Sequence, residues 1–403
     1  MHCSVANSAT GARRMADADL CVVGAGIVGL AHAHEGRRRG LRVVLLERER
    51  CAVGASVRNF GHAFLSGVSD GEDLECALRA RERWLDLGAR ARIPMWDAGT
   101  LVVARAEDEL AVLEGAAANP RRGAVMVNAI EAGRLAPIPT AELVGALHGK
   151  LDLRVDPRSA VAGLARLLEE DPGARVEWGT AVHEIAAGEV SAGVLTVRAP
   201  RIVICPGPGY AALPPRTREG LEQLTLCKLQ MLRIAAPRRR VYAPALVTGL
   251  STIRYPAFTA QRESEDVRRR LLAERPELIE AGIHLLITQL PDGDLIVGDT
   301  HAYGDTLTPF HDEHLDELLL AEARRLLGAG RLEVRQRWLG VYPTRAAGHL
   351  ANSGDHFLVT TPFSGARLVE VASGLGMTMA LGHAASVLDE LEREQAQAAG
   401  RAA

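Results

Sequence analysis

Residues 21–50, CVVGAGIVGLAHAHEGRRRGLRVVLLERER, place three glycines directly after a short apolar run. The run at 21–23 is typical of a buried parallel strand. The glycines that follow it have the spacing G-x-G-x-x-G: Gly24, Gly26 and Gly29. In this pattern the first glycine permits a tight turn, the second lets a pyrophosphate approach the backbone, and the third lets the new helix pack on the strand. The stretch therefore predicts a Rossmann-type unit that binds a dinucleotide.

A second apolar run, residues 43–46, ends at Glu47, close to the offset of about 20 residues at which an acid binds a ribose hydroxyl. A carboxylate at this place repels a 2′-phosphate, which argues against NADP. NAD and FAD share the ADP half that the unit recognises, so the stretch alone leaves both open. The alternative is a glycine-rich turn that binds no ligand.

Composition indicates an ordinary globular protein of two domains. The chain has 403 residues, of which 47% are hydrophobic and 24% charged, with a formal net charge of −3. The one dense basic run, residues 37–39, falls at the end of the first expected helix, where it compensates the helix dipole, so nucleic acid is not an expected partner. No apolar run approaches the roughly 20 residues of a membrane span.

The six cysteines are scattered, without a C-x-x-C pair or metal-ligand spacing. This pattern favours reduced thiols, a cytoplasmic location and no metal site. Residues 1–16 lack a signal-peptide core and are expected to be a disordered extension, with Met15 as an alternative start.

Two kinds of segment alternate along the chain. Residues 17–90, 151–213 and 331–395 carry glycine turns, apolar strands and helical patterns, and are expected to form a nucleotide-binding domain. Residues 91–150 and 214–330 carry strands separated by short turns, and are expected to form a mostly antiparallel substrate domain inserted into the first. The predicted fold is therefore α/β, or α+β as a whole, with a discontinuous Rossmann-type domain and an inserted antiparallel sheet.

Several motifs in this order resemble those of the D-amino-acid-oxidase-like family of FAD amine oxidoreductases, which includes glycine oxidase and monomeric sarcosine oxidase. The motifs are VVGAGIVGLA (22–31), GASVRNFGH (54–62), VDP (155–157), VICPGPG (203–209), GDLIVGD (293–299), RWLGVYP (337–343) and SGLGMT (373–378). The resemblance covers nearly the whole chain after residue 17 and implies FAD rather than NAD.

The resemblance also implies which residues contact FAD. These are Gly24, Ala25, Gly26, Ile27, Val28, Gly29, Glu47, Arg48, Ser56, Arg58, Asn59, Gly61, His62, Val182, Gly207, Gly340, Gly374, Leu375, Gly376, Met377 and Thr378. The helix that begins at SGLGMT would stabilise negative charge that develops on the reduced flavin. Sarcosine-oxidase-like members attach flavin through a cysteine where this chain has Gly340, so the flavin is expected to be noncovalent.

The reaction that the resemblance implies is oxidation of a C–N bond, in which a neutral amine loses hydride to the flavin and the resulting imine is hydrolysed. Oxygen or an electron carrier then takes the electrons. Glycine-oxidase-like members have a carboxylate-binding arginine at the position that Tyr342 occupies here, so we expect a different residue to bind the anionic group of the substrate. The candidates for the substrate pocket are His62, Lys228, Arg254, Tyr255, His301, Tyr342 and Arg345.

The stretches SVRNFGHAF (56–64) and RWLGVYPT (337–344) most resemble those of an oxidoreductase subgroup associated with aminophosphonate catabolism. That similarity implies a small anionic amine, with 2-aminoethylphosphonate or its N-methyl form as a possible substrate. The alternatives are a glycine- or sarcosine-type amino-acid oxidase, a noncatalytic flavin-binding sensor and a subunit of a heteromeric oxidase. The sequence leaves the oligomeric state open.

Overall fold

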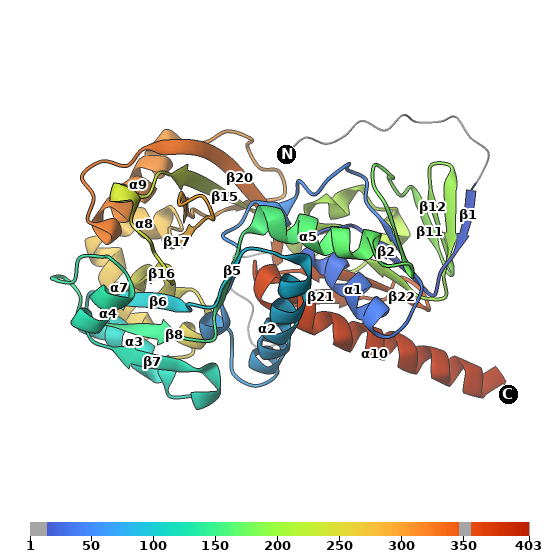
Figure 1. The fold of residues 1–403 in the computed structure, drawn as a ribbon, viewed down its shortest axis with the longest axis horizontal. Coiled ribbons are helices and arrows are strands. Elements are labelled where there is room, and N and C mark those ends of the chain that lie inside the picture. Colours follow the sequence, from blue (N-terminus) through green and yellow to red (C-terminus); the bar gives the residue numbers. More distant parts are fainter. Residues whose placement is uncertain (1–13, 346–355, 403) are drawn as a thin grey trace.

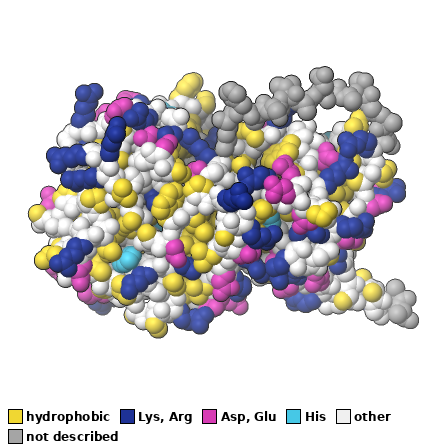
Figure 2. Space-filling view, in the orientation of Figure 1, with side chains coloured by type: hydrophobic (Ala, Val, Ile, Leu, Met, Phe, Trp, Pro, Cys, Tyr) yellow, Lys and Arg dark blue, Asp and Glu magenta, His cyan; other side chains and the backbone are white. Residues whose placement is uncertain are grey.

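The computed structural model describes residues 14–345 and 356–402 and has two lobes (Figure 1). One lobe contains a mainly parallel sheet with helices against it, and the other contains a larger, mainly antiparallel sheet. This arrangement confirms the predicted mixed α/β fold. Basic and acidic side chains are interspersed over both lobes on the face shown in Figure 2. Within the described ranges, no helix is long and apolar enough to cross a membrane.

The first lobe contains a six-stranded sheet of five parallel strands and one antiparallel edge strand. Its order is β10 (Ala174–Glu177), β3 (Val43–Leu46), β2 (Leu20–Val23), β14 (Ile202–Ile204), β22 (Ala366–Val371) and β21 (Phe357–Thr360). The strands β2, β3 and β14 are buried along their whole length, as expected for a parallel sheet that is covered on both faces.

The helices of this lobe are α1 (Ile27–Arg38), α2 (Glu72–Ala91), α5 (Pro157–Glu169) and α10 (Gly376–Ala402). Helix α10 packs against α1 and α2, so the C-terminal segment returns to the lobe that the N-terminal segment begins. Helix α5 begins at the proline of the VDP motif (155–157). The Asp156 side chain accepts hydrogen bonds from the N–H groups of Arg158 and Ser159, and Pro157 occupies the first turn.

The second lobe is organised by a nine-stranded sheet in which β16 and β6 are the parallel pair and the other neighbours are antiparallel. Its order is β19 (Ala302–Gly304), β15 (Leu224–Ile234), β18 (Leu295–Gly298), β17 (Leu286–Gln289), β16 (Ala245–Thr248), β6 (Thr100–Ala104), β8 (Gly145–Gly149) and β7 (Ala124–Val127), and β20 (Val334–Arg345) pairs with β15 off this path.

The helices of the second lobe lie against this sheet and one another. They are α3 (Glu107–Ala117), α4 (Ala129–Leu135), α6 (Pro256–Thr259), α7 (Ser264–Glu274), α8 (Pro276–Glu280) and α9 (Glu313–Leu327). Helices α7 and α8 do not form one continuous helix, because Pro276 lacks the N–H that an uninterrupted helix would need and instead begins α8.

Two small sheets complete the fold. One joins β4 (His62–Ala63), β9 (Leu153–Val155) and β5 (Met95–Trp96), and the other has the order β1 (Arg14–Asp17), β13 (Leu195–Arg198), β12 (Glu189–Ala192) and β11 (Glu184–Ala186).

Two predicted boundaries differ from the structure. Residues 14–16, which we expected within a disordered extension, belong to β1, whose backbone pairs in parallel with β13. The rest of that extension, residues 1–13, lies outside the described residues. Residues 334–345, which we placed in the nucleotide-binding domain, form β20 in the second sheet, because they pair with β15 along nearly its whole length.

Candidate active site

A cavity of about 790 Å³ is lined by residues of both lobes. At one end lie the glycine turn after β2, Glu47, Ser56 and Val182, and we call this part the glycine-turn end. Arg254, Tyr255, Asp299, His301 and Tyr342 also line the cavity, and we call this group the arginine end.

The glycine turn is held by contacts that leave no room for a side chain. Gly24 has φ of +100°, and a Cβ atom there would lie 2.3 Å from the carbonyl oxygen of Cys205. A Cβ atom on Gly29 would lie 1.8 Å from the carbonyl oxygen of Gly24. Since these distances exclude any larger residue without a backbone shift, the spacing of glycines fixes how closely α1 follows β2.

The start of α1 lines the cavity and carries no acidic residue in its first turn. Gly26 precedes the helix without a side-chain cap, and the Ser56 hydroxyl accepts a hydrogen bond of 2.9 Å from the N–H of Ile27. Free N–H groups and the helix dipole at such a terminus favour an anionic group, and small residues allow it to approach. Val28 lines the cavity as well.

Glu47 lies at the end of β3, as the sequence predicted. Its two carboxylate oxygens accept hydrogen bonds from the N–H of Ala25 at 2.7 Å and of Glu49 at 2.9 Å. These bonds fix the carboxylate beside the glycine turn. Arg48 follows it in the lining, and Val182 and Gly207 come from later segments. Ala25 is not itself among the lining residues, and its N–H acts through Glu47.

The loop after β3 is locked by its own hydrogen bonds. The Asn59 side chain donates to the carbonyl of Ala55 and accepts from the N–H of Gly61, which has φ of +67°. Arg58 and Asn59 line the cavity beside Gly340 of β20, whereas Gly61 lies behind the lining. The Trp338 indole N–H donates to the carbonyl of Arg58, so β20 holds this loop.

His62 lines the cavity as a neutral side chain. Its Nε2 lies 2.6 Å from the Thr100 hydroxyl, and its ring stacks on Phe64 with 4.7 Å between centroids. Burial, and then the charge of Arg154, lower the pKa of His62 to about 3. The imidazole can therefore pack or accept a hydrogen bond, but it is not a cation near neutral pH.

The glycine pattern at residues 374–378 opens α10 toward the cavity, and all five residues line it. Gly374 has φ of +75°, and a Cβ atom there would lie 3.1 Å from the Tyr342 ring. The first turn of α10 has no acidic residue, and the Thr378 hydroxyl accepts from the N–H of Phe64. The positive end of this helix therefore faces the cavity.

At the arginine end, Arg254 lies between η7 (Gly249–Ile253) and α6. Its guanidinium donates to the hydroxyls of Tyr342 at 3.2 Å and Tyr303 at 3.3 Å. Burial raises the pKa of the Tyr255 and Tyr342 phenols, so both hydroxyls stay protonated. The Tyr255 ring meets Phe64 edge-on at 4.9 Å. A fixed guanidinium with phenol neighbours is suited to hold a small anion.

Asp299 was missed in the sequence, although it ends the quoted motif GDLIVGD. It is 7% exposed, lines the cavity, and has no hydrogen-bond partner for Oδ1. Burial raises the pKa of Asp299 to about 7, and the charge of Arg254 opposes that rise. His301, which was predicted, lies 3.9 Å from this oxygen through Nδ1, and the same nitrogen contacts the carbonyl of Gly282 at 2.8 Å. An aspartate after a strand-like apolar run, Leu295–Val297, and a glycine was the available signal.

Glu370 of β22 is a second buried carboxylate in the lining that the sequence did not single out. Its Oε1 has no partner, and burial raises its pKa well above the ordinary value. Backbone hydrogen bonds from Gly207 and Val371 place it toward the glycine-turn end.

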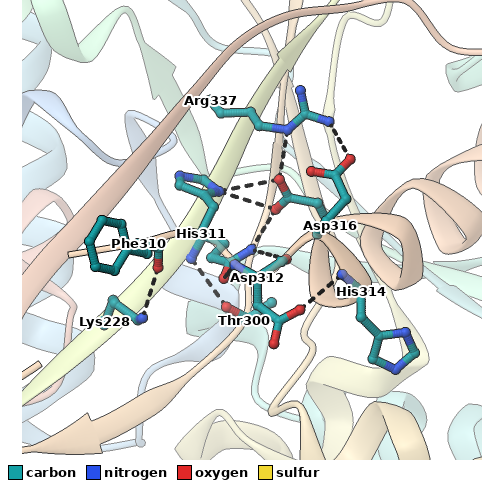
Figure 3. Close-up of polar contacts among 10 residues, drawn as sticks. Lys228, Thr300, Phe310, His311, Asp312, His314, Asp316 and Arg337 are labelled. Carbon is teal, nitrogen blue, oxygen red and sulfur yellow. Dashed lines mark hydrogen bonds and ion pairs between the residues drawn. The ribbon is translucent and has the colours of Figure 1, made fainter. Parts of the chain in front are cut away.

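Lys228 does not line the cavity, contrary to our expectation. Because side chains alternate along β15, Leu229 lines the cavity and Lys228 points away from it. The Lys228 ammonium donates to the carbonyl of Phe310, as Figure 3 shows, and also to the carbonyl of Thr308. Asp316 of α9, which Figure 3 also shows, accepts from the side chains of Gln230 and Arg337. These contacts fasten the segment before α9 to the sheet, which is a structural role.

Arg345 also lies outside the lining. It ends β20, and its guanidinium donates to the Gln223 side chain at 2.6 Å. The register of β20 explains the difference, because Gly340 and Tyr342 line the cavity whereas Arg345 is paired with Leu224, the first residue of β15. Of the two arginines that we predicted to bind an anion, Arg254 lines the cavity and Arg345 does not.

The first lobe has the parts of a dinucleotide-binding unit: a parallel strand, a glycine turn, a helix and an acid at the end of the next strand. The second lobe contributes the other residues that line the same cavity. Together they define a class of dinucleotide-binding proteins with two lobes. The chain belongs to the family of FAD-dependent oxidoreductases known as DAO, whose model matches residues 19–390. This match confirms the predicted family and FAD as its cofactor.

Solved structures with the same fold include L-proline dehydrogenase from P. horikoshii, 16% identical, with a TM-score of 0.74 over 92% of each chain. Glycine oxidase from Geobacillus kaustophilus is 19% identical, with a TM-score of 0.71 over 94% of this chain and 95% of that chain. Iminodiacetate oxidase from Chelativorans sp. BNC1 is 18% identical, with a TM-score of 0.68 over 90% and 93%. At these identities the likeness shows the fold alone.

A curated relative, the probable oxidoreductase OrdL of Haemophilus influenzae, is 45% identical over 56 residues. The matched stretch spans 14% of this chain and 13% of that protein.

The glycine-turn end fits the ADP half of FAD. The turn excludes side chains, Glu47 offers a fixed carboxylate to a ribose hydroxyl, and the start of α1 offers N–H groups to a pyrophosphate. The loop containing Arg58 and the start of α10 lie where the rest of the cofactor would continue toward the arginine end. The contact of each predicted residue with FAD stays a prediction.

Proposed function

We propose that the protein oxidises the C–N bond of a small, anionic primary or secondary amine to an imine, which water hydrolyses to a carbonyl compound and to ammonia or a smaller amine. The observation that carries the proposal is that one cavity contains both an FAD-type glycine turn and Arg254. The Arg254 guanidinium is held by hydrogen bonds to two tyrosine hydroxyls. FAD, when bound, supplies the hydride acceptor. The solved neighbours named as glycine oxidase and iminodiacetate oxidase support an amine as the substrate.

The residues of the arginine end would bind and orient the substrate. Arg254 would hold the anionic group, and its contacts with Tyr303 and Tyr342 restrict the guanidinium to one orientation. Neutral His62 and the Phe64 ring form an uncharged neighbouring surface, which suits the carbon that is oxidised. A phosphonate at Arg254 and an amine two carbons away would make 2-aminoethylphosphonate or its N-methyl form the substrate.

We propose noncovalent attachment of FAD. Gly340 stands where the resembling oxidases carry their attachment cysteine. Cys205 lines the cavity at the glycine-turn end, but burial raises the pKa of its thiol well above the ordinary value, so it stays a weak nucleophile. Acid precipitation of the purified protein should release FAD into the supernatant, and colour retained in the pellet would contradict noncovalent attachment.

The test of the proposed reaction is anaerobic mixing of the purified, FAD-containing protein with a panel of amines. The panel contains 2-aminoethylphosphonate, its N-methyl form, glycine, sarcosine, iminodiacetate and L-proline. We expect the flavin absorbance to fall with an anionic amine, and fastest with an aminophosphonate. Reduction by glycine or sarcosine alone would instead favour the amino-acid oxidase. Flavin that stays oxidised with every amine would favour a sensor or an isolated subunit of a larger oxidase.

A further inference from the structure

Asp299 is a buried carboxylate without the hydrogen-bond partners that would stabilise a charge in the interior. Its Oδ1 has no hydrogen-bond partner, although the side chain is only 7% exposed and lines the cavity. An unpaired charge in such a place costs free energy, so a buried carboxylate normally has a partner. Two other buried charged groups do have partners: the Lys228 ammonium donates to two backbone carbonyls, and Asp316 accepts from the side chains of Gln230 and Arg337 (Figure 3).

Arg254 lies near Asp299 without neutralising it. Its charge lowers the pKa of Asp299, but in the described part of the chain the guanidinium donates to tyrosines and forms no ion pair with Asp299. The two opposite charges therefore line one cavity while both keep capacity for another partner.

The other groups around Asp299 are neutral or weakly polar. Burial lowers the pKa of His301 and of His284, so neither imidazole is a cation near neutral pH. Burial raises the pKa of Tyr255, Tyr303 and Cys227, so none of these is an anion. Among the described residues, the titratable groups near Asp299 are Arg254, His301, Tyr255, Tyr303 and Cys227, together with His284, whose backbone pairs with that of Asp299. The cation in this set, Arg254, already donates to two phenols.

We propose that Asp299 binds the ammonium group of the substrate and accepts one of its protons, while Arg254 binds the anionic group. The arginine end then selects amphoteric molecules that carry an ammonium and an anion a few carbons apart. This inference rests on the proposed function in taking an amine as the substrate. Glu370, a second carboxylate of the cavity with one oxygen that lacks a partner, accepts backbone hydrogen bonds and lies toward the glycine-turn end, away from Arg254.

The proton transfer explains how the amine becomes reactive. Most aliphatic amines are protonated near neutral pH, since their pKa is about 10, and an ammonium nitrogen has no lone pair to support loss of hydride from the adjacent carbon. In the step, an N–H bond of the ammonium breaks and an O–H bond forms on Asp299. The electron pair stays on nitrogen, and the charges of the ammonium and the carboxylate disappear together. A carboxyl group with a pKa of about 7 is suited to accept this proton.

The first test compares the binding of taurine and ethanesulfonate, which share a sulfonate but differ in the ammonium group. Equilibrium dialysis of the FAD-containing protein under nitrogen at pH 8 measures both dissociation constants. We expect the parent to bind taurine at least tenfold more tightly, and Asp299→Asn to bind both equally. The control is Asp294→Asn, which removes a carboxylate at the other end of the same hairpin, where it accepts from Arg233, and which should keep the preference for taurine.

The pH dependence of the same preference needs no variant. Asp299 is charged above a pH of about 7, so the preference of the parent for taurine should grow as pH rises from 5.5 to 8. The sulfonate does not titrate in this range. A preference that is equal at both pH values, or a taurine that binds the parent no better than ethanesulfonate, would overturn the inference even if Asp299→Asn fails to fold.

The second test concerns the proton itself. In anaerobic flavin reduction with the best amine of the panel, the apparent second-order rate constant of the parent should rise with a midpoint near pH 7. In Asp299→Asn the midpoint should move up toward the pKa of the amine. An unchanged midpoint would show that Asp299 does not accept the proton. Binding that depends on Asp299 in a protein whose flavin no amine reduces would sink the proposed function and leave the ammonium site intact.

Discussion

The two ends of the cavity are built in different ways. The glycine-turn end is made largely by backbone that closely packed glycines shape, and its Glu47 carboxylate accepts from two backbone N–H groups. The arginine end is made by side chains from strands and loops far apart in the sequence, with Arg254 and Asp299 as its charged groups. A ligand of the first end would therefore contact mainly backbone, whereas single substitutions can change the groups that the second end offers to a ligand.

The largest effect should follow from breaking the glycine-turn end. In Gly24→Ala the new Cβ meets the Cys205 carbonyl at 2.3 Å in a left-handed conformation, so we expect loss of bound FAD and a fall of about 3–5 kcal/mol in the free energy of unfolding. Flavin content after purification and urea denaturation measure both. Gly40→Ala is the control, since Gly40 also has a positive φ but open space, and should cost about 1–2 kcal/mol and keep FAD. Equal losses would contradict steric exclusion as the cause.

At the arginine end, replacing a charged group should have the opposite effect on stability. The raised pKa of Asp299 means that the folded state holds its proton more strongly than the unfolded state, so stability is lost as pH rises through about 7. Relative to the parent, Asp299→Asn should therefore gain about 2–3 kcal/mol in the free energy of unfolding between pH 5 and pH 8. Chemical denaturation at the two pH values measures this gain, and a difference that does not change with pH would show that Asp299 is not strained by its charge.

Replacing Glu47 by glutamine should weaken FAD binding without changing the fold. The amide lacks the charge and one acceptor oxygen, and a hydrogen bond to a charged group contributes about 1.5–3 kcal/mol, which corresponds to a rise of about 10- to 150-fold in the dissociation constant. Fluorescence titration of the apoprotein with FAD measures the change. Glu189→Gln, in an exposed ion pair with Arg198, serves as the matched control and should bind FAD as the parent does.

The smallest expected change is that of Arg254→Lys. Lysine keeps the charge but cannot reach both phenols and an anion with a planar fork, so the amine concentration for half-maximal flavin reduction should rise about tenfold. The rate at saturation should change less, which is the pattern of lost uniform binding. Arg233→Lys, at an ion pair with Asp292 and Asp294 away from the cavity, should match the parent. A fall in saturated rate alone would place Arg254 in the chemical step instead.

The sequence predicted the glycine-turn end well because its residues are contiguous and their spacing is imposed by backbone geometry. Gly24, Gly26, Gly29 and Glu47 lie where the motif places them, and the fold class and family were confirmed. The arginine end was predicted in part, with Arg254 and Tyr342 brought together as expected.

What the sequence could not provide was the direction of individual side chains. Lys228 and Leu229 are adjacent in β15, and nothing in the letters shows which of them lines the cavity. Asp299 was read as the end of a motif, because a single residue after a strand does not show whether it has a partner. The pairing of β20 with β15 likewise depends on contacts across more than 100 residues, which a pass along the chain does not reveal.

The central claim is that an amine at the arginine end is oxidised by FAD at the glycine-turn end of the same cavity. The most direct measurement is an anaerobic titration of the purified protein with the amine of the panel that reduces it fastest, with the carbonyl product assayed at each step. We expect each equivalent of amine to bleach one equivalent of bound flavin and to yield one equivalent of carbonyl product. Flavin that stays oxidised with every amine, or bleaching without carbonyl product, would contradict it.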